Sequence, residues 1–144
     1  MATTVPRNVL GLDVGERRIG VALASLVARI PNPLLTIDRV QNTDVFNTIK
    51  KLVAEHDVQV LVVGLPRGLE GQETDQTRAT REFVDEMKKH LDIEVELQDE
   101  ASTSVLAEQE LVAKKKLFEK ADIDKLAAAY ILQDWLSGAT VEQL

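Results

Sequence analysis

Residues 9–24 read VLGLDVGERRIGVALA, which predicts two strands joined by a short turn, with an aspartate inside the first strand. Residues 9–13 and 18–24 are the two predicted strands, and a glycine in the short connection favours a hairpin. Asp13 interrupts an otherwise apolar strand. Because an ionised carboxylate that is buried without a partner is costly, Asp13 requires a partner.

The rest of the chain alternates between helix and strand patterns. The predicted elements after the hairpin are a strand over 34–37, a helix over 45–53, a strand over 58–64, a helix over 75–90, a strand over 93–97, and helices over about 104–115 and 122–136. The strand over 58–64 is almost wholly apolar, which is typical of a central strand buried on both faces. Three meandering strands followed by a β-α-β-α order predict one α/β domain over 1–144, a mixed sheet with helices packed on it.

The composition limits the chemistry that the 144 residues can support. The chain has no cysteine and only two histidines, so disulfides, thiolate metal sites and histidine-rich metal sites are not expected. A bound metal would instead be a hard cation held by oxygen atoms, such as Mg²⁺ or Mn²⁺. No apolar run approaches the roughly 20 residues of a membrane span, and the N-terminus lacks the pattern of a signal peptide. We therefore expect a soluble, cytoplasmic protein with no membrane partner.

Acidic residues recur at three places where the packing pattern predicts apolar or neutral side chains. Asp13 lies at the end of the first predicted strand. Asp99 and Glu100 come just after the alternating strand, and Asp124 lies on the inward stripe of the last helix. Each of these carboxylates needs a partner if the predicted packing is right.

Two kinds of partner could satisfy these carboxylates. Arg17, Arg18 or Lys125 could form structural ion pairs with single acids. A divalent metal could be held by several acids together, because Mg²⁺ binds a few carboxylates plus water and a substrate phosphate. Two such ions about 4 Å apart can activate a water and stabilise the leaving oxygen in phosphodiester cleavage. Because strand ends meet at one edge of a sheet, where sites form, the metal is the favoured interpretation for the three places together.

Four blocks of the sequence resemble the YqgF family, also called RuvX, of ribonuclease H-like nucleases. The blocks are GLDVGERRIGVALA (11–24), VVGLPRGLEG (62–71), LQDEAST (97–103) and DKLAAAYILQDWL (124–136), in the order and spacing of the family. The first block alone also resembles the phosphate loop of sugar-kinase and actin-like ATPases. Since 144 residues cannot supply the two domains that such ATPases close around a nucleotide, the four blocks together favour the nuclease family.

The resemblance implies a ribonuclease H-like fold with a mixed five-stranded sheet, in which three antiparallel strands are followed by parallel strands and helices flank the sheet. It also implies that Asp13, Glu100 and Asp124 are catalytic ligands of Mg²⁺ or Mn²⁺, with two ions expected, and Asp99 is a further candidate ligand. The implied function is hydrolysis at the 5′ end of precursor 16S ribosomal RNA. The alternatives are resolution of Holliday junctions and a non-catalytic nucleic-acid-binding module. The expected partner is therefore pre-rRNA or branched DNA, bound by a monomer or by a homodimer.

One position departs from the family pattern. The family usually reads Asp-Glu-Arg where this chain reads Asp99-Glu100-Ala101. The absent arginine could have oriented the glutamate or held a phosphate, so its loss bears on both activity and substrate binding. Arg67, in the loop that follows the central strand, is the substitute that we hypothesise.

Basic residues supply the remaining candidates for contact with a substrate. Arg17 and Arg18 lie at the start of the second predicted strand, and strand alternation means that at most one of them faces a phosphate. Lys114, Lys115 and Lys116 close a predicted helix, where positive charge suits the helix dipole as well as a nucleic-acid backbone. Because the net charge is −7, a nucleic-acid-binding surface would have to be local.

Overall fold

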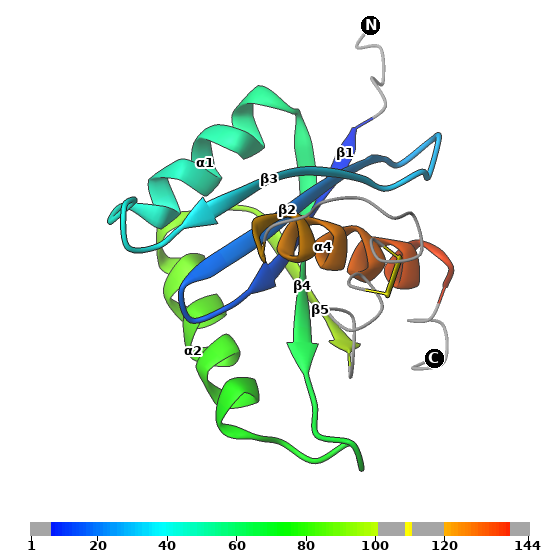
Figure 1. The fold of residues 1–144 in the computed structure, drawn as a ribbon. Helices are drawn as coiled ribbons and strands as arrows, with labels where there is room; N and C mark the ends of the chain where they lie inside the picture. Colours follow the sequence, from blue (N-terminus) through cyan, green and yellow to red (C-terminus); the bar gives the residue numbers. More distant parts are fainter. Residues whose placement is uncertain (1–6, 101–108, 111–119, 139–144) are drawn as a thin grey trace, which may run out of the picture.

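The computed structural model describes residues 7–100, 109–110 and 120–138. Its strands are β1 (Asn8–Val14), β2 (Arg18–Ser25), β3 (Asn32–Asp38), β4 (Val58–Pro66) and β5 (Glu94–Glu100) (Figure 1). Its helices are α1 (Val45–Glu55), α2 (Asp75–His90) and α4 (Lys120–Leu136). The predicted helix over 104–115 lies outside the described residues, except for 109–110, which are helical. Within the described part of the chain, no helix has the length and apolar character needed to cross a membrane.

The strands form one mixed sheet in the order β3-β2-β1-β4-β5. The β1–β2 and β2–β3 pairs are antiparallel, whereas β4 runs parallel to β1 and β5 runs parallel to β4. The expected arrangement, a meander of three strands followed by parallel strands, is therefore confirmed. Because β1 and β4 lie inside the sheet, their apolar side chains can be buried on both faces.

The end of β5 differs from the prediction. The strand continues to Glu100, so Asp99 and Glu100 lie inside it and not after it. β4 continues as far as Pro66, and Pro66 is the register partner of Glu100. Main-chain pairing with β4 thus carries β5 past its last apolar residue, and this pairing fixes the position of both acids.

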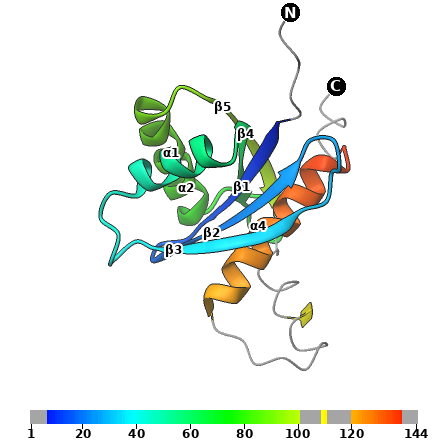
Figure 2. The same cartoon turned by 90° about the horizontal axis from the view of Figure 1, so that it is seen from above.

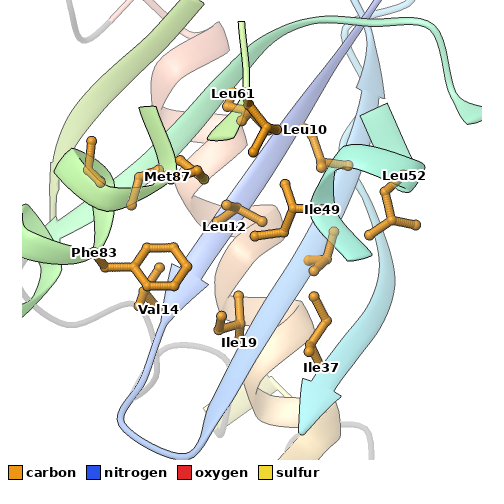
Figure 3. Packing of buried hydrophobic residues seen from close by; sticks show 14 of the residues in the cluster. Leu10, Leu12, Val14, Ile19, Ile37, Ile49, Leu52, Leu61, Phe83 and Met87 are labelled. Atoms are coloured by element: carbon orange, nitrogen blue, oxygen red, sulfur yellow. The ribbon is translucent and has the colours of Figure 1, made fainter. Parts of the chain in front are cut away.

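Helices cover both faces of the sheet, as Figure 2 shows from above. α1 and α2 pack on one face, where Leu10 and Leu12 of β1 join a core that includes Met87 (Figure 3). α4 packs on the opposite face, where a second core includes Val9 of β1 and Leu132 of the helix. Alternate residues of β1 therefore belong to different cores, and the protein has three layers of the α/β class.

α4 approaches the sheet closely because glycines lie beneath it. A Cβ atom on Gly20 would lie 1.9 Å from the main-chain oxygen of Asp124. A Cβ atom on Gly11 would lie 2.5 Å from Cγ of Leu132. Both distances are shorter than real Cβ atoms tolerate, so a larger residue at either position would displace its neighbour.

We expect Gly20→Ala to destabilise the fold more than Gly11→Ala. The methyl group at position 20 meets the main chain of α4, which cannot rotate away, so the free energy of unfolding should fall by about 3 kcal/mol or more. The methyl group at position 11 meets chiefly a side chain, that of Leu132, and lies farther from the helix main chain, at 3.1 Å from the Ala128 oxygen, so that loss should be about 1–2 kcal/mol. Urea unfolding of both variants beside the wild type measures the two losses. Equal losses would contradict the contact between Gly20 and the helix main chain.

Candidate active site

Asp13 lies near the end of β1, on the face that α4 covers. Leu12 and Val14 belong to the core on the α1–α2 side, so strand alternation directs Asp13 to the other side. Its register partner on β2 is Gly20, which leaves no side chain between the strand and the helix. Burial, together with the negative charge of Asp124, raises the pKa of Asp13 to about 6. The fold therefore holds this carboxylate where its ionised form is disfavoured.

Glu100, the last residue of β5, also lies in an environment that disfavours its charge. Burial is the largest cause that raises the pKa of Glu100 to about 9, followed by a side-chain hydrogen bond with Asp134 of α4. The charges of Asp134, Asp13 and Asp99 act in the same direction. Its Oε1 atom is buried and has no hydrogen-bond partner among the described residues. A buried oxygen without a partner requires an explanation, and a bound cation is one that suits a carboxylate.

Asp124, in the first turns of α4, is held by Arg18 of β2. The Nε–H group of Arg18 donates to Oδ2 of Asp124 at 2.6 Å. The two side chains are 29% and 20% exposed, so the ion pair is partly buried. Lys125 pairs instead with Asp122, with 3.5 Å between Nζ and Oδ1. Of the cations that the sequence offers to Asp124, the structure therefore selects Arg18.

The chemistry of the three carboxylates suits a hard divalent cation. All the donor atoms are oxygens, and a cation would offset burial, which is the largest cause that raises the pKa of Asp13 and of Glu100, as well as the repulsion by nearby acids. Within the described ranges, no three acidic or histidine side chains lie close enough together to hold one ion. Asp124 is paired with Arg18, so Asp13 and Glu100 are the two of these carboxylates that we expect to bind a cation.

Arg67 lies beside Glu100, the residue that precedes Ala101, where the family usually has an arginine. Its main-chain N–H group donates to the carbonyl oxygen of Glu100 at 3.1 Å. Its guanidinium pairs with Asp99, at 3.3 Å from Nε to Oδ1, and with Glu73, at 3.6 Å from Nη1 to Oε2. Asp99 is thus an ion-pair partner in this structure. Substrate binding by Arg67 and metal binding by Asp99 stay predictions.

The other basic candidates contribute less to the described site. Arg17 is exposed at the turn before β2 and does not share the position of Arg18 on the α4 side. Lys114, Lys115 and Lys116 lie outside the described residues. Their contact with a nucleic-acid backbone therefore stays a prediction.

Sequence reasoning did not single out Asp134, which the fold brings to Glu100. The signal was nevertheless present, because Ala127, Ile131 and Asp134 are spaced as i, i+4 and i+7 on one face of a helix. Ala127 and Ile131 are buried on that face. An acid on an apolar stripe is the same anomaly that drew attention to Asp124.

Known proteins share this sequence pattern and fold. A family model described as "RuvX: Holliday junction resolvase" matches residues 7–138. A Chloroflexus aggregans protein named "Putative pre-16S rRNA nuclease" is 46% identical over 132 residues, which cover 90% of this chain and 93% of that protein. A protein of the same name from Sulfurihydrogenibium sp. is 42% identical over 131 residues, covering 90% of this chain and 89% of that protein. The solved structure of Thermus thermophilus RuvC, 11% identical, matches with a TM-score of 0.54 over 93% of this chain and 96% of that chain, which confirms the ribonuclease H-like fold.

We expect Asp13→Asn to stabilise the protein at alkaline pH when divalent ions are chelated. The pKa of Asp13 in the folded chain is about 6, above its ordinary value, so the folded state binds this proton more tightly than the unfolded state does. The stability that this group contributes is complete below about pH 4 and is lost as the pH rises through about 6. A neutral amide avoids that loss, which is at most about 3 kcal/mol.

Urea unfolding in EDTA, from about pH 5 to about pH 8, measures this difference. The advantage of Asp13→Asn over the wild type should grow with pH across that range. Asp92→Asn changes an exposed carboxylate and serves as the matched control without such a trend. A wild type that is more stable than Asp13→Asn at every pH would contradict the raised pKa.

Proposed function

Because the chain belongs to the RuvX family, we propose that it is a divalent-metal-dependent nuclease that hydrolyses nucleic-acid phosphodiesters. The observation that carries the proposal is that Asp13 of β1 lies next to Asp124 of α4, whose main chain rests on the register partner of Asp13, and within electrostatic reach of Glu100 of β5. We propose precursor 16S rRNA as the substrate, since relatives that match 90% of the chain are named as pre-16S rRNA nucleases, and we propose cleavage at its 5′ end.

Asp13 and Glu100 would hold the metal ion, and Asp124 would join them. When bound, such an ion supplies a Lewis acid that activates water and offsets charge on the phosphate. The contribution of the protein is to keep carboxylates together although they repel one another. β1 and β5 fix Asp13 and Glu100 on one sheet, and α4 fixes Asp124. Since this repulsion is relieved by positive charge, the site favours a divalent cation.

Arg18 would have two roles, as the partner of Asp124 and as a contact for the substrate. A guanidinium binds a phosphate with the same planar array of donors that it offers to a carboxylate. A substrate phosphate can therefore compete with Asp124 for Arg18. Release of Asp124 would then complete the carboxylate set at the moment when the substrate is present.

Cleavage of a four-way DNA junction is the second candidate function. The description of the matching family model favours it. Junction resolution needs two active sites related by symmetry, so it requires a homodimer, whereas trimming of an RNA end needs one site. In a third, non-catalytic alternative, the ion pair between Arg18 and Asp124 would be permanent, and the chain would bind nucleic acid without cutting it.

We expect the wild type to cut an end-labelled precursor 16S 5′ fragment in Mg²⁺ or Mn²⁺. Asp13→Asn removes a metal ligand and should slow cleavage by a factor of about 100 or more. Asp92→Asn is the control and should cut as fast as the wild type. An unrelated single-stranded RNA and a four-way DNA junction, tested beside the fragment, show which substrate is preferred. Binding without cleavage of any substrate would contradict the nuclease and favour the non-catalytic alternative.

Metal binding can be measured without catalysis. We expect Mn²⁺ to raise the Tm of the wild type, by the equivalent of about 2.7 kcal/mol when the ion is at about 100 times its Kd. Asp13→Asn should respond little, and Arg18→Gln should respond at lower Mn²⁺ concentration because Asp124 is no longer paired. Differential scanning fluorimetry over a series of Mn²⁺ concentrations gives all three curves. Equal responses of the wild type and Asp13→Asn would place the ion at another site.

A further inference from the structure

A leucine is exposed to solvent beside the candidate site. Leu69 is 97% exposed, compared with 62–69% for the other exposed large apolar residues of the described ranges, which are Val27, Ile30 and Val40. Single apolar residues at a surface are common and need no explanation by themselves. Leu69 differs from the other three because its loop borders Glu100.

Hydrogen bonds hold the loop that carries Leu69 in one shape. The N–H group of Gly68 donates to the Gln72 carbonyl oxygen at 2.8 Å, and the N–H group of Gly71 donates to the Gly68 carbonyl oxygen at 2.9 Å. The Gln72 side chain accepts the N–H group of Glu70 at 2.9 Å and lies against Gly68, where a Cβ atom would be 2.3 Å from Gln72 Cδ. Gln72 therefore packs against the main chain of the loop, whereas the Leu69 side chain is exposed to solvent.

Hydrogen bonds attach one end of this loop to Glu100 and the other end to α2 and the end of β4. At the first end, Arg67 donates its main-chain N–H group to Glu100. At the other end, Thr74 caps α2, and Thr77 donates its hydroxyl group to the Pro66 carbonyl oxygen. The loop and the end of β5 border an open pocket of about 420 Å³, which is lined by Arg67, Gly68, Leu69, Gly71, Asp99 and Glu100.

The charges around this pocket favour a nucleobase over a phosphate. Arg67 is the cation among the lining residues, and its guanidinium is already paired with Asp99 and Glu73. Asp99 adds negative charge beside this guanidinium, which disfavours a phosphate group there. An exposed apolar side chain beside polar groups instead suits a base and its sugar, because apolar residues such as leucine pack against unstacked bases.

On the basis of the proposed nuclease function, we propose that this pocket is a nucleotide subsite in which an unpaired base next to the cleaved bond packs on Leu69. The ligand class is a single-stranded or frayed end of a nucleic acid, because a base in a continuous duplex is stacked and cannot enter the pocket. The loop would then select the substrate by its unpaired end, and the carboxylates would act on the adjacent phosphodiester.

The subsite is tested by measuring oligonucleotide binding in Ca²⁺, which replaces Mg²⁺ or Mn²⁺ so that binding is followed separately from cleavage. We expect Leu69→Ala to weaken the binding of a fluorescein-labelled single-stranded RNA by about tenfold, measured by fluorescence anisotropy. Val27→Ala is the matched control, because Val27 is also exposed but follows the end of β2 that is away from Arg18. This variant should bind the RNA as the wild type does. The wild type should also prefer the single strand to a blunt RNA duplex, and Leu69→Ala should lose that preference.

A cysteine footprint locates the contact directly, because the chain has no cysteine of its own. Alkylation of the thiol in Leu69→Cys should slow by about tenfold or more when the RNA is bound, whereas the thiol in Val27→Cys should react at an unchanged rate. If Leu69→Ala binds as tightly as the wild type and the thiol at position 69 is not protected, the subsite is wrong while the nuclease proposal stands. If the wild type binds no oligonucleotide and cuts none, both proposals fail.

Discussion

The close approach of α4 to the sheet at Gly20 is the constraint on which the rest of the structure depends. Because Gly20 has no side chain, the main chain of α4 at Asp124 rests directly on β2 at this position. Gly20 is also the register partner of Asp13, so the helix lies close to that carboxylate. A larger residue would push the helix outward and separate the two carboxylates. Thr36 of β3 holds the same end of the helix, because its hydroxyl group donates to the Ala121 carbonyl oxygen at 2.6 Å. The position of one carboxylate thus depends on the absence of a side chain on the neighbouring strand.

Two apolar cores allow the sheet to hold like charges together. β4 lies between the strands that carry Asp13 and Glu100, and its residues Leu61 and Val62 are fully buried in the opposite cores. Burial of apolar surface on both faces stabilises the sheet, whereas repulsion among the carboxylates opposes folding. The site therefore departs from the usual rules of packing on a sheet that these two cores stabilise. Arg18 partly compensates on the α4 side.

The strands could be predicted because their signals are local, whereas the connections at the site could not. Apolar runs and alternation within each segment located all five strands. The end of β5 depends on pairing with β4, so polar residues as far as Glu100 remain in a strand that the local pattern ends earlier. The choice of Arg18 for Asp124 depends on contact between residues 106 positions apart, and nothing local distinguishes Arg18 from Lys125. The fold class followed from periodicity, but the partners within the site required the packing of α4.

The order in which the elements are synthesised gives the position of α4 a further meaning. β1 leaves the ribosome early and α4 late, so a growing chain can form its sheet before the helix exists. Until then, Val9, Ala22 and Val62 lie on an uncovered apolar face, which is a surface that chaperones bind and that promotes aggregation. The helix that covers this face also carries Asp124. Docking of α4 therefore covers the apolar face of the nascent chain and brings Asp124 to Arg18 in a single step of folding.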